Sequence, residues 1–287
     1  MSALALGLVL AAAAIHATWN YLLKRSGGGI AFVWLFATVS AAIYAPIAAA
    51  VVWWTQPALT PMSYVLMVAS ALIHTAYYML LDRGYRSGGD LSLVYPLARG
   101  SAPLITVAVA VLLLHEQPTA VAVAGALLIA GGAVVLTGNL RKLREAGSLP
   151  AVAFALLTGC TISSYTVVDK LAVAAFAVPP LLQDWATNLG RVVIMTPMAL
   201  HQRAALGATW RRARFEIIAV AVLCPLSYIL VLTAMVFTPV SYVAPAREIS
   251  ILIATLLGAH LLMEQDAPRR LAGAAAMVAG IVCLALG

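Results

Sequence analysis

Charged residues are scarce in this sequence. Only 9% of the 287 residues are Asp, Glu, Lys or Arg, whereas 63% are hydrophobic, and the mean hydropathy is +1.00. Soluble domains carry about 25% charged residues, so this composition excludes a soluble globular protein. We therefore expect a protein that crosses the lipid bilayer several times.

Cysteine and the motifs of common enzyme and metal chemistry are also scarce or missing. The sequence has three cysteines, all in apolar runs, where they form no disulfide or metal framework. We expect no metal and no cofactor, because no His, Cys and carboxylate cluster has ligand spacing. The sequence lacks a nucleotide-binding loop, a Gly-x-Ser-x-Gly motif and paired intramembrane aspartates. We accordingly expect no direct use of ATP, no catalytic residues and no enzyme.

Long apolar runs make up most of the chain. A helix needs about 20 apolar residues to cross the bilayer, and ten segments have roughly this length: 2–22, 30–54, 62–81, 91–114, 119–138, 150–170, 178–200, 216–237, 240–263 and 268–287. The connections between them, of which 139–149 and 201–215 are the longest, are too short for a soluble domain. We therefore predict an all-α polytopic membrane protein whose function lies inside the bilayer.

The basic residues predict how the chain sits in the membrane. Of 17 Lys and Arg residues, 13 fall in alternate connections, and at most Lys170 lies in the others. Basic loops stay on the cytoplasmic side, so the net charge of +7 serves topology and does not indicate a nucleic-acid partner. We expect a monomer in a bacterial-type inner membrane, with both termini in the periplasm.

An internal repeat divides the chain into two halves. Pro, Arg, Glu-Gln and Gly recur in one order, which pairs Pro96 with Pro245, Arg99 with Arg247, Glu116 with Glu264, Gly125 with Gly273 and Gly132 with Gly280. We predict a first five-helix repeat over 1–140, a basic connection over 141–148 and a second repeat over 149–287. Because five is odd, the second repeat is inverted in the membrane, an architecture typical of secondary transporters.

Several segments carry a recognisable pattern: HATWNYLLKRS, YRSGGDLSLVYPLARGSAPL, LHEQP, LMEQDAP and the Gly/Ala-rich spans GALLIAGGAVVLTG and GAAAMVAGIVCLALG. In these segments the chain resembles the EamA family of the drug/metabolite transporter superfamily. The resemblance implies a central cavity lined by helices one, three, four, six, eight and nine, with the fifth and tenth helices at the periphery, and it implies export. Members of this superfamily are often described with cytoplasmic termini, whereas the basic loops of this chain predict the reverse.

Charged residues inside the apolar runs are the first candidate substrate-binding residues. Arg99 and Arg247 follow a proline in equivalent spans, and a charge in hydrocarbon usually faces a wet or substrate-filled interior. Glu248 has no acidic counterpart in the first repeat. It either pairs with its neighbour Arg247, which is the simplest expectation, or holds a substrate ammonium or a coupling proton. Tyr95 precedes Pro96 in the same segment and joins the candidates.

Polar residues on three other helices complete the set. Asp184 and Arg191 lie on one face of the seventh span with Asn188 between them. His74 and Tyr77 form a polar aromatic face on the third span, as Trp19 and Asn20 do with His16 on the first. Such side chains suit the cavity of an amphipathic solute, but they also simply pack or anchor at interfaces.

These features favour a secondary transporter. We expect a small anionic or zwitterionic metabolite, such as an amino acid or organic acid, to move by alternating access, with protons as a possible coupling ion and Glu248 or Asp184 as their carriers. The alternatives are an intramembrane enzyme and a non-transporting membrane sensor or partner. Transport of a solute panel into proteoliposomes would separate the three.

Overall fold

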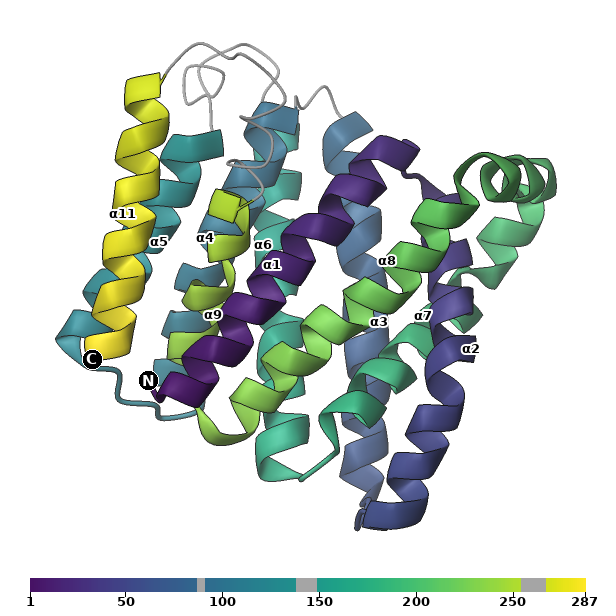
Figure 1. Ribbon diagram of the computed structural model, residues 1–287, viewed down its shortest axis with the longest axis horizontal. Coiled ribbons are helices and arrows are strands. Elements are labelled where there is room, and N and C mark those ends of the chain that lie inside the picture. Colours follow the sequence, from purple (N-terminus) through teal and green to yellow (C-terminus); the bar gives the residue numbers. More distant parts are fainter. Residues whose placement is uncertain (87–90, 138–148, 254–266) are drawn as a thin grey trace.

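The protein is all-helical over the residues that the structure describes. The computed structural model describes residues 1–86, 91–137, 149–253 and 267–287 (Figure 1). These ranges contain no strand. The helices are α1 (Ala3–Ser26), α2 (Ile30–Thr55), α3 (Pro61–Arg86), α4 (Leu91–Leu113), α5 (Ala120–Thr137), α6 (Leu149–Lys170), the π-helix η2 (Leu171–Ala175), α7 (Pro180–His201), α8 (Arg203–Phe237), α9 (Val240–Arg247) and α11 (Ala267–Leu286).

Several helices match the thickness of a bilayer. Within the described ranges, five are long and apolar enough to cross one, over Ala3–Leu23, Ile30–Thr55, Pro61–Leu81, Leu149–Ala175 and Arg203–Phe237. Three shorter apolar helices cover Leu97–Leu113, Ala120–Leu136 and Leu271–Leu286. These lengths are compatible with the membrane protein predicted from composition.

One predicted connection is helical. From the sequence we predicted that residues 201–215 connect two spans. In the structure α8 begins at Arg203, and only Gln202 separates it from α7. Ala, Leu and Arg are good helix formers, so this basic segment forms two helical turns or more despite its low hydropathy. The helix bends at Ala213, whose φ of −132° and ψ of 28° are not helical. A hydropathy scan detects apolar length and therefore missed this part of α8.

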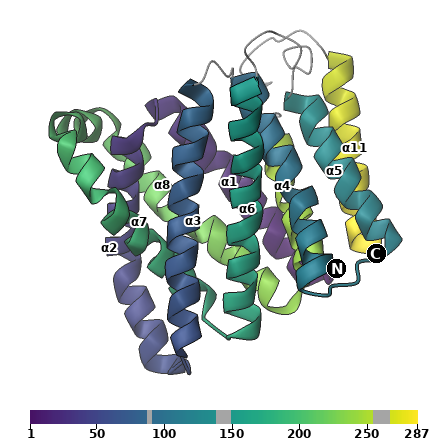
Figure 2. The ribbon, with the colours of Figure 1, turned by 180° about the vertical axis from the view of Figure 1, so that it is seen from behind.

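The main helix contacts join the first part of the chain to the second. α1 packs on α8, α3 on α6, α2 on α7 and α5 on α11, so neighbours in space are far apart in sequence (Figures 1 and 2). Glycines bring α5 and α11 close together. A Cβ atom on Gly125 would lie 2.7 Å from the Gly280 carbonyl oxygen, and one on Gly132 would lie 2.7 Å from that of Gly273. This close apolar contact holds α5 and α11 at one side of the bundle.

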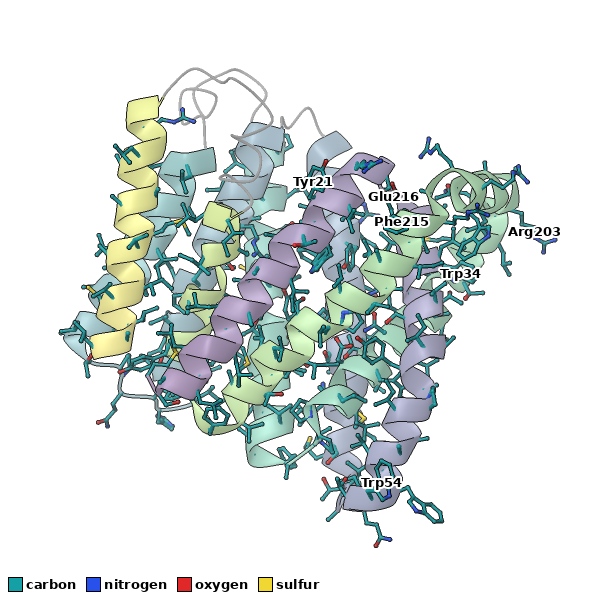
Figure 3. The ribbon with its side chains drawn as sticks, in the orientation of Figure 1. Tyr21, Trp34, Trp54, Arg203, Phe215 and Glu216 are labelled. Atoms are coloured by element: carbon teal, nitrogen blue, oxygen red, sulfur yellow. The ribbon has the colours of Figure 1, made fainter. Side chains whose placement is uncertain are left out.

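Both chain termini lie at one end of the bundle, and basic residues gather at the other. α1 ends at this second end, where α8 begins (Figure 1), and Figure 3 shows Arg203 and Glu216 there. Arg212 donates to the Ser26 carbonyl at 2.9 Å, and Arg25 lies 3.6 Å from Glu216. The basic side chains therefore also tie the C-terminal end of α1 to α8.

Candidate functional site

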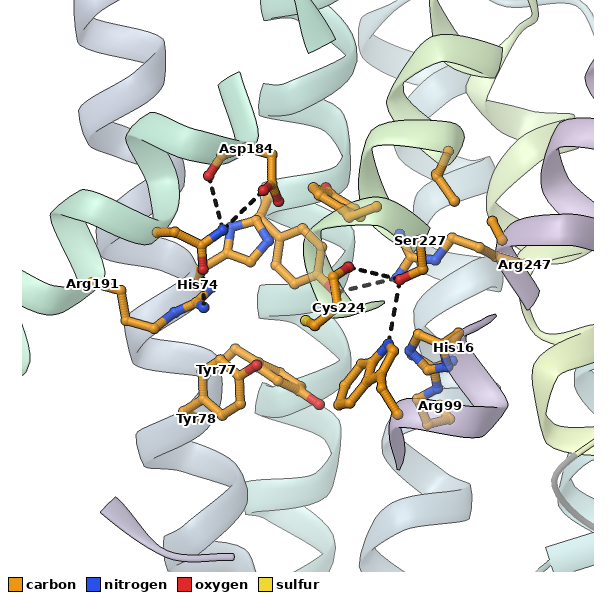
Figure 4. Close-up of a pocket in the computed structure, with 16 residues that line it drawn as sticks. His16, His74, Tyr77, Tyr78, Arg99, Asp184, Arg191, Cys224, Ser227 and Arg247 are labelled. Carbon is orange, nitrogen blue, oxygen red and sulfur yellow. Dashed lines mark hydrogen bonds between the residues drawn. The ribbon is translucent and has the colours of Figure 1, made fainter. Parts of the chain in front are cut away.

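A cavity of about 80 Å³ lies inside the helix bundle (Figure 4). Side chains from seven helices line it: Ala12, His16 and Trp19 of α1; His74, Tyr77 and Tyr78 of α3; Arg99 of α4; Tyr165 of α6; Asp184, Asn188 and Arg191 of α7; Cys224, Ser227, Tyr228 and Val231 of α8; and Arg247 of α9. A cavity needs about 10–15 Å³ to hold one water molecule. The cavity thus has room for several waters or a small polar solute.

Most of the candidates chosen from the sequence lie around this cavity. Seven of the ten line it: Trp19, His74, Tyr77, Arg99, Asp184, Arg191 and Arg247. Asn20 is not among the lining residues, and it donates to the backbone carbonyl of His16, which is one of them, at 2.8 Å. Glu248 is buried next to Arg99. The side chain of Tyr95 lies outside the described residues.

The salt bridge of Glu248 differs from the one we expected. The sequence favoured pairing with the adjacent Arg247, but a carboxylate oxygen of Glu248 lies 2.9 Å from Nε of Arg99, on α4. The side chains are 3% and 5% exposed. Adjacent residues on a helix point about 100° apart, so Glu248 faces α4 while Arg247 faces the cavity. Arg99 also donates to Ser250 at 3.5 Å, which ties α4 to the segment after α9.

The helical segment that begins with α9 is interrupted at Glu248, directly after Arg247. Glu116 accepts hydrogen bonds from the Val240 and Ser241 N–H groups at 2.8 and 2.9 Å and caps the start of α9. The helix ends at Arg247, and residues 249–253 are helical again. Glu248 N–H bonds to the Pro245 carbonyl three residues back, a tighter turn than an α-helix has. The break therefore lies at the residue that pairs with Arg99.

Arg247 has neutral neighbours in the cavity. One of its N–H groups donates to the Tyr165 hydroxyl at 3.3 Å, and its guanidinium carbon lies 5.5 Å from the centre of the Tyr228 ring. The side chain is 8% exposed, and within the described part of the chain its Nη1 atom has no hydrogen-bond partner. Arg247 therefore has donor capacity left for an anionic group.

A polar chain along α7 forms the opposite wall. Asn188 donates to a carboxylate oxygen of Asp184 at 2.9 Å and accepts from Arg191 at 2.9 Å. The Asn188 amide thus joins the acid to the base, which confirms that these residues share one face. Arg191 also lies over the Tyr78 ring, 4.9 Å from its centre. Figure 4 shows Asp184 and Arg191 on the side of the cavity away from Arg99 and Arg247.

Aromatic side chains occupy the space between the two charged walls. The His74 ring stacks on Tyr165 with 3.8 Å between centroids, and Tyr77 and Tyr228 each stand edge-on to Tyr165 at 6.2 Å. Trp19 donates to the Ser227 hydroxyl at 3.3 Å. Such rings offer apolar faces with polar tips, so the cavity presents aromatic surface between cationic ends.

The sequence reading missed one buried acid, Asp169. It lies near the C-terminal end of α6, is 0% exposed, and accepts from the Tyr228 hydroxyl at 2.5 Å and from the Gln183 amide at 2.8 Å. Asp169 and Asp184 are both buried, but each has its own hydrogen-bond partners, so the expectation that paired aspartates are lacking stays a prediction. The sequence suggested that the adjacent Lys170 lies in a connection between spans. In the structure its ammonium donates to the Met235 and Thr238 carbonyls at the end of α8.

The described side chains offer hydrogen bonds and charges and no metal-ligand cluster. Within the four described ranges, no group of three or more His, Cys, Asp or Glu residues is placed to hold a metal ion. What the cavity presents is cationic donors, a carboxylate and aromatic faces. This set can bind a small solute that has a negative group, with or without a positive one.

Comparison with known proteins gives the fold and leaves the activity open. No family model and no curated protein matches the chain. Among solved structures 29 chains match. One of them, described only as "Crystal structure of protein", has a TM-score of 0.77 and 17% sequence identity, and the match covers 98% of each chain. The chain therefore shares the fold of that protein over 98% of its length.

Proposed function

We propose that this protein is an EamA-type secondary transporter that moves a small anionic or zwitterionic metabolite by alternating access. The observation that carries the proposal is the buried cavity that Arg99, Arg191 and Arg247 line together with Asp184. Charges inside a bilayer are costly, and they usually mark a substrate or ion pathway. A protein that places three guanidinium groups around one small space has a site for anions.

The contacts between α5 and α11 support two inverted halves. The sequence repeat pairs Gly125 with Gly273 and Gly132 with Gly280, whereas in space Gly125 meets Gly280 and Gly132 meets Gly273. A two-fold axis produces this crosswise pattern, because it exchanges each residue with its counterpart. The cross-packing of α1 on α8 and α3 on α6 follows the same exchange. We therefore propose five helices over 1–140 and five over 149–287, related by an axis in the membrane plane.

The two walls of the cavity suggest how a solute binds. Arg247, with its remaining N–H capacity, would bind a carboxylate or similar anion. Asp184 on the opposite wall would accept from an ammonium group if the solute has one. The aromatic rings between them would contact its apolar part. This arrangement favours a solute of amino-acid or organic-acid size.

The break at Glu248 supports movement between the halves. Discontinuous helices near the middle of the membrane form the sites of many secondary transporters. The Arg99–Glu248 salt bridge joins α4 to the broken segment, so rocking of the halves would strain or open it. We propose that the halves turn about the cavity and expose it to each side alternately, in a bacterial-type inner membrane.

The central experiment is transport by the purified protein in proteoliposomes. A panel of labelled amino acids, dicarboxylates and organic amines is offered, and counterflow is measured for each. We expect counterflow of an anionic or zwitterionic solute and none of the pure amines. Preference for amines, or no counterflow of any panel solute together with a hydrolytic activity, would contradict the proposal.

Orientation is tested separately. Because the basic helix ends lie opposite both termini, we propose that the termini face the periplasm. Alkaline phosphatase fused after Gly287 should be active in cells, and a fluorescent protein at the same position should stay dark. Fluorescence with inactive phosphatase would reverse the orientation without affecting the binding site.

A further inference from the structure

Asp169 is a buried acid that the cavity lining does not include. Its two carboxylate oxygens accept from neutral donors, the Tyr228 hydroxyl of α8 and the Gln183 amide of α7, and the Ser70 hydroxyl of α3 also lies against it. A buried carboxylate is stable only if its oxygens are satisfied. Asp169 meets this condition without a salt bridge among the described residues, whereas Glu248 meets it through the guanidinium of Arg99.

We propose that Asp169 is the site at which this protein binds a coupling proton, and that the change of charge acts on the solute through Tyr228 and Arg247. The inference rests on the proposed transport function and names the ion that drives it. It replaces Glu248 and Asp184, which the sequence favoured as proton carriers. Asp169 does not touch the solute, so its role is that of a positioning residue.

The amide of Gln183 is suited to both protonation states of Asp169. Its Nε2 group donates to the carboxylate, while its Oε1 atom is buried and, within the described ranges, has no hydrogen-bond partner. An amide that turns over offers an acceptor where it offered a donor. A protonated Asp169 would then donate to Gln183 Oε1. Turning the amide over breaks no hydrogen bond of this oxygen, because it has none within the described ranges. The site therefore has a partner for the acid with or without its proton.

In the described part of the chain, the other two buried acids are connected to arginines, Glu248 directly and Asp184 through the neutral amide of Asn188. Protonation of Glu248 would leave Arg99 buried without its counter-charge, and loss of a buried partner typically costs several kcal/mol. Asp184 is joined to Arg191 through Asn188. A proton on Asp169 breaks no ion pair among the described residues, so Asp169 is the acid that can exchange one with the least change in structure.

Charged and titratable groups face Asp169 from several packed helices. Those that act on it are Asp184 of α7, Tyr228 of α8 and Arg247 of α9, with Ser70 of α3 and Gln183 of α7 as hydrogen-bonding neighbours. His74 and Tyr165 lie beside the Tyr228 ring. Lys170 is directed to the end of α8. Arg247 acts on Asp169 electrostatically and lies above the Tyr228 ring. The charge of Asp169 is therefore felt by the group that we propose binds the anion.

The sign of the coupling follows from these charges. An ionised Asp169 partly compensates Arg247, so a solute anion competes with it for the same positive field. Once Asp169 is neutral, Arg247 has more attraction left for the solute. Proton and anion should therefore bind together, and by thermodynamic reciprocity each strengthens the other. We expect the affinity for an anionic solute to rise about fivefold or more as the pH is lowered through the titration of Asp169.

The backbone after Asp169 has room to adjust. Residues Leu171–Ala175 form a π-helix, in which Phe176 N–H bonds to the Leu171 carbonyl five residues back. π-helical turns are rare in proteins overall, but many of those that occur lie at functional sites. A change of hydrogen bonding at Asp169 can therefore be taken up in this turn without a break in the rest of α6.

The test combines a direct reading of the proton with transport. Infrared difference spectra of the purified protein in lipid are recorded across a pH series, for the wild type, Asp169→Asn and, as a matched control, Asp184→Asn. We expect a protonated-carboxyl band that titrates in the wild type and in Asp184→Asn and is missing in Asp169→Asn. In proteoliposomes, Asp169→Asn should retain solute counterflow but lose accumulation driven by a pH gradient.

A second variant covers the case in which Asp169→Asn does not fold. Gln183→Leu keeps Asp169 and removes the amide beside it. The pH at which half of the carboxyl band has titrated and the pH dependence of transport should then shift together. A band that does not titrate, or an Asp169→Asn protein that still follows the gradient, overturns the inference. If no panel solute moves with the wild type, the transport proposal fails, and the infrared titration still decides whether Asp169 binds a proton.

Discussion

Arg99 and Arg247 occupy equivalent places in the two halves of the sequence but have different surroundings. Arg99 lies 2.9 Å from the carboxylate of Glu248 and also donates to Ser250. Arg247 contacts the Tyr165 hydroxyl and the face of the Tyr228 ring, both neutral groups. The same residue type in a repeated position thus has a carboxylate in direct contact in one case and, among the described residues, neutral groups in direct contact in the other.

This difference assigns the two arginines different roles. In our proposal Arg99 holds the two halves together, and Arg247 binds a solute. The Arg99–Glu248 bridge joins α4 of the first half to the segment after α9 of the second. An arginine already bound to a carboxylate attracts a second anion weakly. Arg247 retains donor capacity, as its Nη1 atom shows. We therefore expect Arg247 to govern affinity for the solute and Arg99 to govern the stability and the movement of the halves.

The largest effect should come from Arg247. Arg247→Ala removes the donor that we propose binds the anion, so counterflow should be abolished while membrane abundance stays near wild type. Arg247→Lys should restore little, because an ammonium lacks the fork of N–H groups. Counterflow is measured in proteoliposomes at matched protein content. Full activity of Arg247→Ala would show that the anion binds elsewhere, and loss of abundance would indicate a structural charge.

Much of this site was predictable from the sequence. Arg99, Arg191, Arg247 and Asp184 stand out because charges are rare in apolar runs, and helical spacing put Asp184 and Arg191 on one face. The all-helical fold followed from composition. The contacts between distant residues could not be predicted in this way. Adjacency in the sequence favoured Arg247 as the partner of Glu248.

Asp169 shows why the rest was missed. It stands next to Lys170 at the end of an apolar run, a place typical of interfacial residues, and the tertiary packing of α6 against other helices buries it. Its partners Tyr228 and Gln183 are 59 and 14 residues away. The one available signal was an acid within the last turn of a predicted span. That signal does not distinguish a membrane surface from a buried site.

The next effect concerns stability. Glu248→Gln leaves the Arg99 guanidinium buried without its counter-charge, and we expect a loss of about 3–5 kcal/mol in the free energy of unfolding. Arg99→Gln should lose a similar amount. The double variant should lose clearly less than the sum, because neither unpaired charge remains. Unfolding in detergent micelles measures all three. Additive losses would mean that the bridge is not the main interaction of either residue.

A smaller effect should follow from the cap of the helix that carries Arg247. Glu116 accepts two backbone N–H groups at the start of α9. Glu116→Ala should lower the free energy of unfolding by about 1–2 kcal/mol and weaken solute binding, because Arg247 would be held less firmly. Gln117→Ala, an exposed neighbour in the same loop, is the control and should change neither. Equal effects of the two would assign the loss to the loop in general.

The smallest effect distinguishes the two arginines by their hydroxyl partners. Tyr165→Phe removes the hydrogen bond to Arg247, and Ser250→Ala removes the one to Arg99. A single hydrogen bond is worth about 0.5–1.5 kcal/mol, so Tyr165→Phe should weaken apparent solute affinity about two- to tenfold. Ser250→Ala should leave affinity unchanged, because Arg99 keeps its bridge to Glu248. Solute titrations of counterflow give both values. If Ser250→Ala weakened affinity as much as Tyr165→Phe did, both arginines would bind the solute, and the division of roles between the two halves would be wrong.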